Sequence, residues 1–253
     1  MQFGACIQSS NALVAQTGGW DFIEENVQSF FKGQSTDWQA PPAVALPVPS
    51  ANSLVPATLP IVGPNVDAAA LRQYMTNVIT RAQQVQMHTL VFGSGGARNV
   101  PDGFDRNKAV DQITAFLAMA GPIAQQHGVT LVIEPLNRGE CNILNSVAEA
   151  MTYVKRLNHP HVKCLVDSYH MWLEDEPLSN LEAAMPDIYH VHVADKEERV
   201  APGESGKSDY LSFFKVLKAG GYDKLIAVEC RGFDLQTNGP RSLKFLQDNW
   251  AKA

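Results

Sequence analysis

Four side chains that can bind a metal ion stand at or near the ends of short apolar runs in the second half of the chain. They are Glu134 after residues 129–133, Asp167 after 162–166, His192 within 187–193 and Glu229 after 225–228. Such a donor set consists mainly of oxygen atoms, and it suits Mn²⁺, Mg²⁺ or Co²⁺ with open positions better than the closed tetrahedron of structural Zn²⁺. Three carboxylates at one place would also repel one another unless a cation neutralised them. The sequence therefore predicts a divalent-metal site.

Each of these residues has an ordinary explanation when it is taken alone. A carboxylate at the end of a strand often pairs with a lysine or caps the next helix. Two histidines, His190 and His192, share one strand and point to the same side because side chains alternate along a strand. We assign His192 to the metal because it lies nearer the end of the strand. For His190 we expect an inward-facing barrel residue that makes a hydrogen bond.

The elements that carry these residues alternate regularly between helix and strand. Apolar residues at helical spacing occupy 68–86, and the compact apolar run 88–92 follows them directly. The same alternation returns in a helical stretch over 110–124, which contains Pro122, and in the strand-like run 129–133. Repeated units of this kind predict a parallel sheet with helices outside it.

Strand-like runs occur eight times, which predicts a single (β/α)₈ barrel domain over residues 1–253. We expect these strands near residues 3–7, 22–23, 44–48, 88–92, 129–133, 162–166, 187–193 and 225–228. An open doubly wound sheet is disfavoured because no glycine-rich phosphate fingerprint follows the first run. Catalytic groups of such a barrel sit at the carboxyl ends of its strands, where the four donors are expected. The segment 39–63 is rich in Pro, Ser and Ala, and we expect this loop to cover the site.

Composition and charge exclude several classes of protein. The 253 residues are 45% apolar and carry a formal net charge of −6, whereas proteins that bind duplex DNA usually present a basic stripe. No Lys or Arg precedes Lys32, and no apolar run approaches the ~18 residues of a membrane span, so we expect a cytoplasmic protein without a membrane partner. The four cysteines are widely spaced, which favours reduced thiols over a disulfide framework.

Several longer motifs give the sequence a specific family resemblance. These motifs are Glu134-Pro-Leu-Asn-Arg138 with Glu140, Asp167-Ser-Tyr-His-Met171, His190-Val-His-Val-Ala-Asp195, Pro202-Gly-Glu204 and Val228-Glu-Cys-Arg231. Through them the sequence resembles, over essentially its whole length, the sugar phosphate isomerase/epimerase family of xylose isomerase-like TIM barrels, and more narrowly the ketose 3-epimerases such as tagatose and psicose epimerases.

The resemblance implies roles for individual residues. Family residues that match Glu134, Asp167, His192 and Glu229 hold a divalent ion, commonly Mn²⁺, with Mg²⁺, Co²⁺ or Zn²⁺ as other candidates. The matching glutamates also shuttle the proton, so Glu134 and Glu229 are the implied catalytic pair. The positions of Glu140 and His170 match residues that contact the sugar substrate. Relatives are often dimers or tetramers, so the resemblance also implies a homo-oligomer.

Two segments leave the choice of substrate open. An arginine after the strand-seven histidine contacts substrate in the family, and the matching residue here is Arg199, one position later than usual. The highly charged run 195–199 could present Lys196 to the substrate instead, or it could be a solvated loop. The glycine-rich residues 93–96 could cradle an anion, with Arg98 as the natural partner of a phosphorylated substrate.

The expected reaction is removal of a proton beside a sugar carbonyl, through an enediolate that the metal stabilises. One glutamate removes the proton and the other returns one to the opposite face, which gives an epimerase; other proton paths give an isomerase. Loss of a β-hydroxyl group would make the protein a dehydratase or lyase acting on a keto-inositol or a keto-glycoside. Further alternatives are an endonuclease IV-like enzyme, disfavoured by the acidic charge balance, and a sugar-binding barrel without catalysis.

Overall fold

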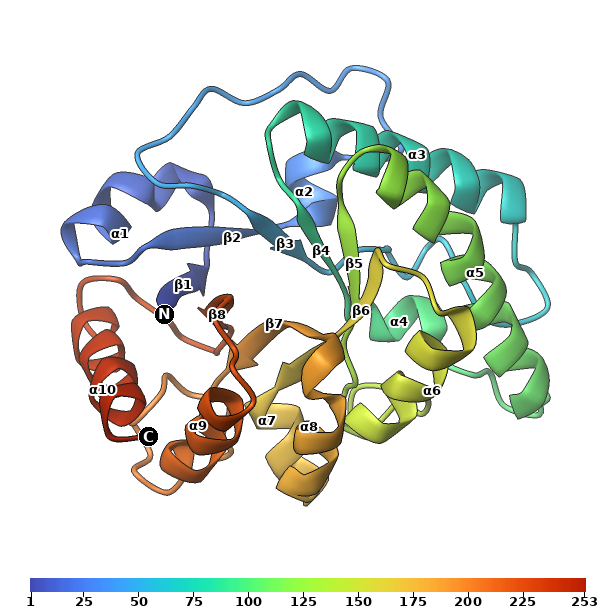
Figure 1. Cartoon of the computed structure of the whole chain (residues 1–253). Helices are drawn as coiled ribbons and strands as arrows, with labels where there is room; N and C mark the ends of the chain where they lie inside the picture. Colours follow the sequence, from blue (N-terminus) through green and yellow to red (C-terminus); the bar gives the residue numbers. More distant parts are fainter.

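Eight parallel strands form a closed barrel at the centre of the molecule (Figure 1). The structure is a computed structural model, and it describes all residues from Met1 to Ala253. The strands are β1 (Gln2–Cys6), β2 (Phe22–Asn26), β3 (Ser50–Asn52), β4 (Thr89–Phe92), β5 (Thr130–Ile133), β6 (Val162–Asp167), β7 (Ile188–Val193) and β8 (Leu225–Val228). The barrel closes where β1 pairs with β8, with Gln2 opposite Leu225. The predicted (β/α)₈ fold is therefore confirmed.

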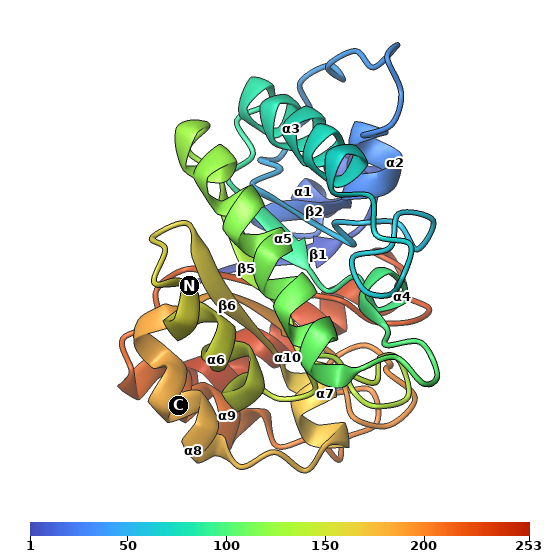
Figure 2. The ribbon, with the colours of Figure 1, turned by 90° about the vertical axis from the view of Figure 1, so that its right-hand side faces the viewer.

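Helices surround the barrel and bury its outer surface. They are α1 (Ala12–Thr17), α2 (Val27–Phe31), α3 (Ala68–Gln84), α4 (Gly95–Arg98), α5 (Arg106–Gln126), α6 (Val147–Leu157), α7 (Ser168–Leu173), α8 (Leu178–Ala184), α9 (Tyr210–Ala219) and α10 (Gly239–Lys252). In Figure 2, α3 and α5 lie side by side across one flank of the barrel. One large apolar cluster fills the space between the helices and the outward side chains of the strands.

Local sequence signals explain where the predicted helices begin. The Asp67 side chain accepts hydrogen bonds from the backbone N–H groups of Ala69 and Ala70, which caps α3. Asp105 caps α5 in the same way, and this helix contains Pro122 within its length. The capping residue of α6 is Ser146, whose hydroxyl accepts from the backbone N–H of Glu149. The helices expected at 68–86 and 110–124 are thus confirmed to within a few residues.

The expected third strand, residues 44–48, is wrong. The strand is Ser50–Asn52, and the residues before it form irregular backbone. Pro47 and Pro49 use their carbonyl groups to accept from Ile23 and from Thr89, but proline has no N–H to continue a ladder of hydrogen bonds. The true strand was not recognised because its residues, Ser, Ala and Asn, have a polar composition although all three are buried.

The loop expected to cover the site lies mostly elsewhere. Residues 40–48 run along the outside of the barrel, and Ala45 accepts a hydrogen bond from the Gln16 side chain of α1. They border a hollow of about 600 Å³ whose other walls include Phe30 and the end of α3, and no titratable side chain lines it. In Figure 1 this segment arches outside β2 and β3. Of the expected loop, only residues within 52–57 reach the mouth of the barrel.

The cysteines and the helices bear on two smaller expectations. The four cysteines are all free thiols, as their spacing predicted. No helix combines the length and the apolar character that crossing a bilayer requires.

Candidate metal and active site

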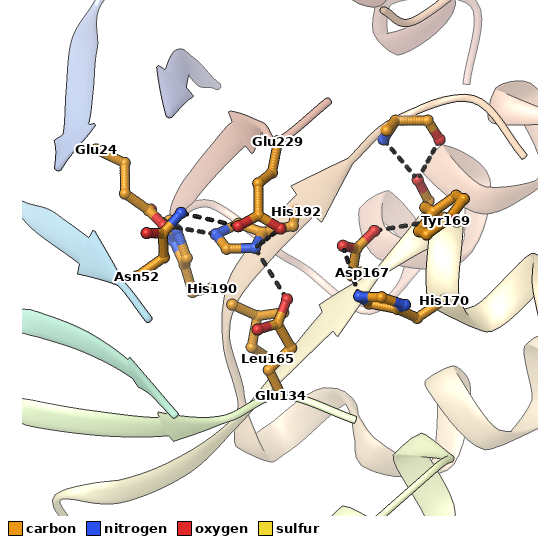
Figure 3. A network of polar contacts seen from close by, with 12 residues as sticks. Glu24, Asn52, Glu134, Leu165, Asp167, Tyr169, His170, His190, His192 and Glu229 are labelled. Atoms are coloured by element: carbon orange, nitrogen blue, oxygen red, sulfur yellow. Dashed lines mark hydrogen bonds and ion pairs between the residues drawn. The ribbon is translucent and has the colours of Figure 1, made fainter. Parts of the chain in front are cut away.

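The four predicted donors meet at the carboxyl ends of consecutive strands. Glu134 follows β5, Asp167 ends β6, His192 lies near the end of β7, and Glu229 follows β8. One donor atom from each residue lies within 4.8 Å of the others. Figure 3 shows the two glutamates on opposite sides of the group, with the His192 ring next to Glu229 and Asp167 to one side of both. Each of four neighbouring strands thus contributes one donor at or near its carboxyl end, which is the placement expected from the sequence.

One oxygen atom of Asp167 indicates that the group fits a cation. Its Oδ1 atom accepts from the backbone N–H of Tyr169 at 2.8 Å and caps α7. Its Oδ2 atom is buried and has no hydrogen-bond partner. A buried carboxylate oxygen without a partner is costly, and a divalent ion held jointly with Glu134, His192 and Glu229 would satisfy it. Together with the mainly oxygen donor set, this atom makes the site suitable for Mn²⁺, Mg²⁺ or Co²⁺.

The carboxylates differ in how strongly they hold a proton. Burial raises the pKa of Asp167 to about 7. Burial and the neighbouring Glu229 carboxylate both raise the pKa of Glu134. For Glu229 burial acts in the same direction, but contact with His192 outweighs it and holds the pKa at about 2. A bound cation would favour the charged form of all three groups, because its positive charge replaces the lost hydration.

The imidazole of His192 is held between two sets of carboxylates. Its Nδ1 atom lies 3.1 Å from Oε1 of Glu134 and 3.5 Å from Oε2 of Glu229. Its Nε2 atom lies 2.7 Å from Oε1 of Glu24 in β2. His190 reaches the same carboxylate through its Nε2 atom at 2.6 Å from Oε2. The two histidines therefore point to the same side, as expected, and His190 makes the inward hydrogen bond predicted for it.

Two residues of the site were missed at the sequence level, Glu24 and Asn52. The Asn52 side chain in β3 donates to Oε1 of Glu229 at 2.8 Å, and Glu24 is completely buried beside the two histidines. A signal for Glu24 existed, since Phe22-Ile23-Glu24 is an apolar run that ends in a carboxylate, like the runs before Glu134 and Glu229. Asn52 gave no comparable signal, because its strand was not recognised.

Arg199 enters the site from the loop after β7. Its guanidinium group makes an ion pair with Glu229 and lies 3.3 Å from Glu140 and 3.6 Å from Asp167. It also stacks over the ring of Tyr169, with 4.8 Å between the guanidinium carbon and the ring centre. Burial works against the charged form of Arg199, but the surrounding carboxylates outweigh it and raise its pKa. The residue that the resemblance implied as a substrate contact thus lies directly beside the donors.

The backbone of this loop explains why Arg199 is directed inward and Lys196 is not. Buried Asp195 accepts from the backbone N–H groups of Gly203 and Ser205, which holds the two ends of the loop together. Glu198 and Arg199 both have positive φ, at 57° and 56°, so the chain turns sharply at this point. The alternative that Lys196 faces the substrate is wrong, because Lys196 pairs with Asp175 at 2.9 Å on the surface.

His170 presents one ring nitrogen to the site. Its Nδ1 atom accepts from the backbone N–H of Asn137 at 3.1 Å, so the proton of the neutral ring lies on Nε2. The Nε2 atom is buried without a partner, 3.7 Å from Asp167 and 4.0 Å from Glu140. Burial lowers the pKa of His170 to about 3, so the ring stays neutral at physiological pH. His170 is therefore a fixed neutral donor directed at the space beside Asp167.

Arg98 cannot act as the phosphate partner considered above. Its guanidinium group is completely buried and donates to the backbone carbonyl groups of Phe92 and Glu134, at 2.8 and 2.7 Å. It ties the end of β4 to the end of β5 and so supports Glu134 from behind. This role is structural, and the guanidinium is not available to a ligand.

Two cavities meet at Glu229 and form the mouth of the barrel. One has a volume of about 510 Å³ and is bordered by Glu134, Glu140 and Arg199. The other has a volume of about 360 Å³ and is bordered by Glu25 and Asn52. Arg199 is the only Lys or Arg that lines either cavity, whereas five glutamates do so. The mouth is polar and acidic, with space for a small ligand next to the donors.

Gly93, directly after β4, has no side chain, and the Glu134 carboxylate occupies the space beside it. A methyl group at this position would overlap Oε2 of Glu134. For the reaction predicted from the sequence, we expect Gly93→Ala to lower kcat/KM at least about 100-fold, because a shift of about 1 Å in a reacting group has an effect of that size. Steady-state assays of sugar interconversion measure it. Gly18→Ala at the end of α1, where the added atom meets only ordinary contacts at 3.4 Å or more, is the control and should keep wild-type activity.

A family model for the xylose isomerase-like TIM barrel matches residues 50–249 of the chain. This chain belongs to that family. The matched region of the xylose isomerase-like barrel contains all four donors, together with Glu140, His170 and Arg199. It begins at β3 and so leaves out β2, which carries Glu24.

Individual members of the xylose isomerase-like family show how the chain relates to known enzymes. A 3-dehydro-D-guloside 4-epimerase from Escherichia coli (strain K12) is 34% identical over 113 residues, which cover 43% of this chain and 41% of the relative. A D-psicose 3-epimerase from Agrobacterium fabrum is 28% identical over 143 residues, covering 54% of this chain and 48% of the relative. These matches thus span about half, or less, of the relatives' length.

Solved structures extend the similarity of fold to the whole barrel. A D-psicose 3-epimerase with D-tagatose from Clostridium cellulolyticum H10 superimposes with a TM-score of 0.86 at 17% identity, and 99% of each chain is covered. At this identity the agreement concerns the fold of the xylose isomerase-like barrel, and it includes β1 and β2, which the family model does not reach.

Proposed function

We propose that this protein is a divalent-metal-dependent epimerase or isomerase of a keto sugar, with Glu134 and Glu229 as its acid/base pair. The observation that carries the proposal is the placement of the two glutamates on opposite sides of one donor group, at the mouth of a cavity of about 510 Å³. Relatives named as sugar epimerases support the same class of reaction.

The proposed reaction begins with a keto sugar whose carbonyl and neighbouring hydroxyl group face the four donors. A bound divalent ion would polarise the carbonyl group and make the adjacent C–H bond more acidic. One glutamate then removes the proton to give an enediolate, and the other, on the opposite side, returns a proton and inverts the carbon. Asn52 and Arg199 keep Glu229 oriented, because they bind its two carboxylate oxygens.

The charges at the mouth favour a neutral substrate over a phosphorylated one. Arg199 is the only cationic side chain there, and it is already paired with Glu140 and Glu229. Arg98 is buried and Lys196 is engaged on the surface, so no free cation remains for a phosphate. The same lack of basic groups argues against a nucleic-acid substrate. The homo-oligomer and the cytoplasmic location expected from the sequence stay predictions.

A keto-glycoside is a second candidate substrate, because a second cavity of about 360 Å³ adjoins the first at Glu229. The second cavity would accommodate the group attached to the sugar. The guloside epimerase among the relatives acts on a substrate of this kind by its name. The acid/base pair and the metal donors would be the same as for a free ketose.

Proton NMR in D₂O tests the proposed function. The Mn²⁺-loaded protein is incubated with free ketoses, ketose phosphates, keto-glycosides and keto-inositols, and the metal is removed before spectra are recorded. Stereospecific deuterium incorporation beside the carbonyl group of a neutral substrate is the expected result, and the product separates epimerase from isomerase or lyase. Absence of exchange with every compound would overturn the proposal and favour a sugar-binding barrel without catalysis.

His170→Ala should mainly weaken substrate binding. The neutral Nε2–H group of His170 has no hydrogen-bond partner and lies 4.0 Å from Glu140, which borders the larger cavity, and loss of one hydrogen bond is worth about 1 kcal/mol. We expect KM to rise about fivefold with a smaller change in kcat, because the acid/base pair is untouched. Initial rates over a range of substrate concentrations separate the two parameters. His159→Ala, in the turn before β6, is the matched control and should leave both unchanged.

A further inference from the structure

Glu24 is a carboxylate that the proposed reaction does not use, although it lies one layer below the donors. Its side chain is completely buried in the barrel. Oε1 lies 2.7 Å from Nε2 of His192, and Oε2 lies 2.6 Å from Nε2 of His190 and 2.7 Å from the Ser50 hydroxyl. Figure 3 shows Glu24 and the donor group on opposite sides of the His192 ring. Burial of a carboxylate costs free energy unless nearby hydrogen bonds or charges compensate for the lost hydration, so the contacts of Glu24 call for an explanation.

The bond between Glu24 and His192 decides which ring nitrogen faces the donor group. A carboxylate accepts hydrogen bonds, so the Nε2 atom of His192 carries the proton that it donates to Glu24. In the neutral ring the lone pair then lies on Nδ1, on the side of Glu134 and Glu229. Metal-binding histidines commonly donate their second N–H to a carboxylate in this way, which fixes both the tautomer and the ring orientation.

The remaining contacts of Glu24 hold the carboxylate itself in place. Ser50 in β3 donates to Oε2. His190, which lies two residues before His192 on the same face of β7, binds the same oxygen. Contacts from two further strands thus leave Oε1 free to serve His192 alone. The arrangement joins β2, β3 and β7, and none of its members apart from His192 belongs to the group of four donors.

We propose that Glu24 is a positioning residue that sets the ring orientation and tautomer of His192 for binding the divalent ion. The inference rests on the proposed function, since it concerns the same metal. It extends the site to β2, in the front half of the barrel, where no site residue was predicted. Its consequence is that metal affinity depends on a side chain that never contacts the metal.

The test is Mn²⁺ binding by the full-length metal-free protein, measured by electron paramagnetic resonance titration. Glu24→Met removes both acceptor oxygens at similar volume, and we expect its Kd for Mn²⁺ to rise about 10- to 100-fold. Glu24→Gln keeps one acceptor and should show a smaller rise in the same direction. Glu182→Met on the exposed surface of α8 is the matched control, because it makes the same substitution at a carboxylate that does not contact His192, and its Kd should stay close to that of the wild type.

A second readout separates positioning from general damage to the fold. Thermal unfolding of the metal-free variants shows whether they remain folded, and turnover of a folded variant should recover when Mn²⁺ is raised above its new Kd. If Glu24→Met does not fold, Glu24→Gln carries the test. Wild-type affinity for Mn²⁺ in a folded Glu24 variant would overturn the inference and leave the proposed function standing. No Mn²⁺ binding by the wild type would overturn both.

Discussion

Glu134→Gln and Glu229→Gln are each expected to remove nearly all proton transfer. Gln keeps the shape of the side chain and one oxygen donor, but it can neither accept nor return the proton. General acid–base groups contribute about 10²–10⁴-fold, so kcat should fall by at least that factor in either variant. Deuterium incorporation from D₂O and steady-state kinetics, both at saturating Mn²⁺, measure the effect.

Loss of the metal should not be the cause of the lost activity in the two variants. Each keeps three unaltered donors, so Mn²⁺ binding should weaken only in part. Glu182→Gln on the exposed surface of α8 is the control for the Glu to Gln change and should behave as the wild type. Full activity in either active-site variant would sink the assignment of the proton shuttle, even if metal binding were intact.

Removal of divalent ions is expected to abolish activity and to lower thermal stability together. The site gathers three carboxylates, and Asp167 has a buried oxygen without a hydrogen-bond partner, so the ion should bind the folded state strongly. A ligand present at 100 times its Kd stabilises the fold by about 2.7 kcal/mol. For a protein of this size that corresponds to roughly 5–10 °C in Tm.

Chelation followed by stepwise return of Mn²⁺, Mg²⁺, Co²⁺ or Zn²⁺ measures both effects on the same sample. Activity and Tm should rise together over one range of metal concentration. In Asp167→Asn the response of Tm should be much smaller, because a neutral amide oxygen is a weaker ligand for a hard cation. Activity that survives exhaustive chelation would contradict a metal-dependent reaction.

The second half of the fold could be predicted because its strands are mainly apolar runs between helices, several of which have clear caps. Residues 129–133, 162–166 and 225–228 are buried on both faces except at Lys163, as strands of a parallel barrel usually are, and each run is followed by a carboxylate. The first half hides its third strand in the sequence Ser50-Ala51-Asn52. Nothing in the composition of these three residues distinguishes them from the loop that precedes them.

In the site, too, the features that follow from strand order could be predicted, whereas those that depend on the conformation of a loop could not. Strand order places Glu134, Asp167, His192 and Glu229 side by side, so their approach follows from the topology alone. The choice of Arg199 over Lys196 depends on positive φ angles at two loop residues and on the anchoring of Asp195. Such contacts are formed only in the folded loop. The functional roles of these residues stay predictions until they are tested.

Contacts between strands near the two ends of the chain also determine when this site can form during folding. The Asn52 to Glu229 contact spans 177 residues of sequence, and the Glu24 to His192 contact spans 168. Contacts of such long range form slowly, since a large loop must close before they contribute any free energy. On the ribosome, β2 and β3 emerge long before the histidines and Glu229 that they support. The group of four donors and its supporting contacts therefore form only in the final stage of assembly, and a chain that still lacks β8 has no complete metal-binding group.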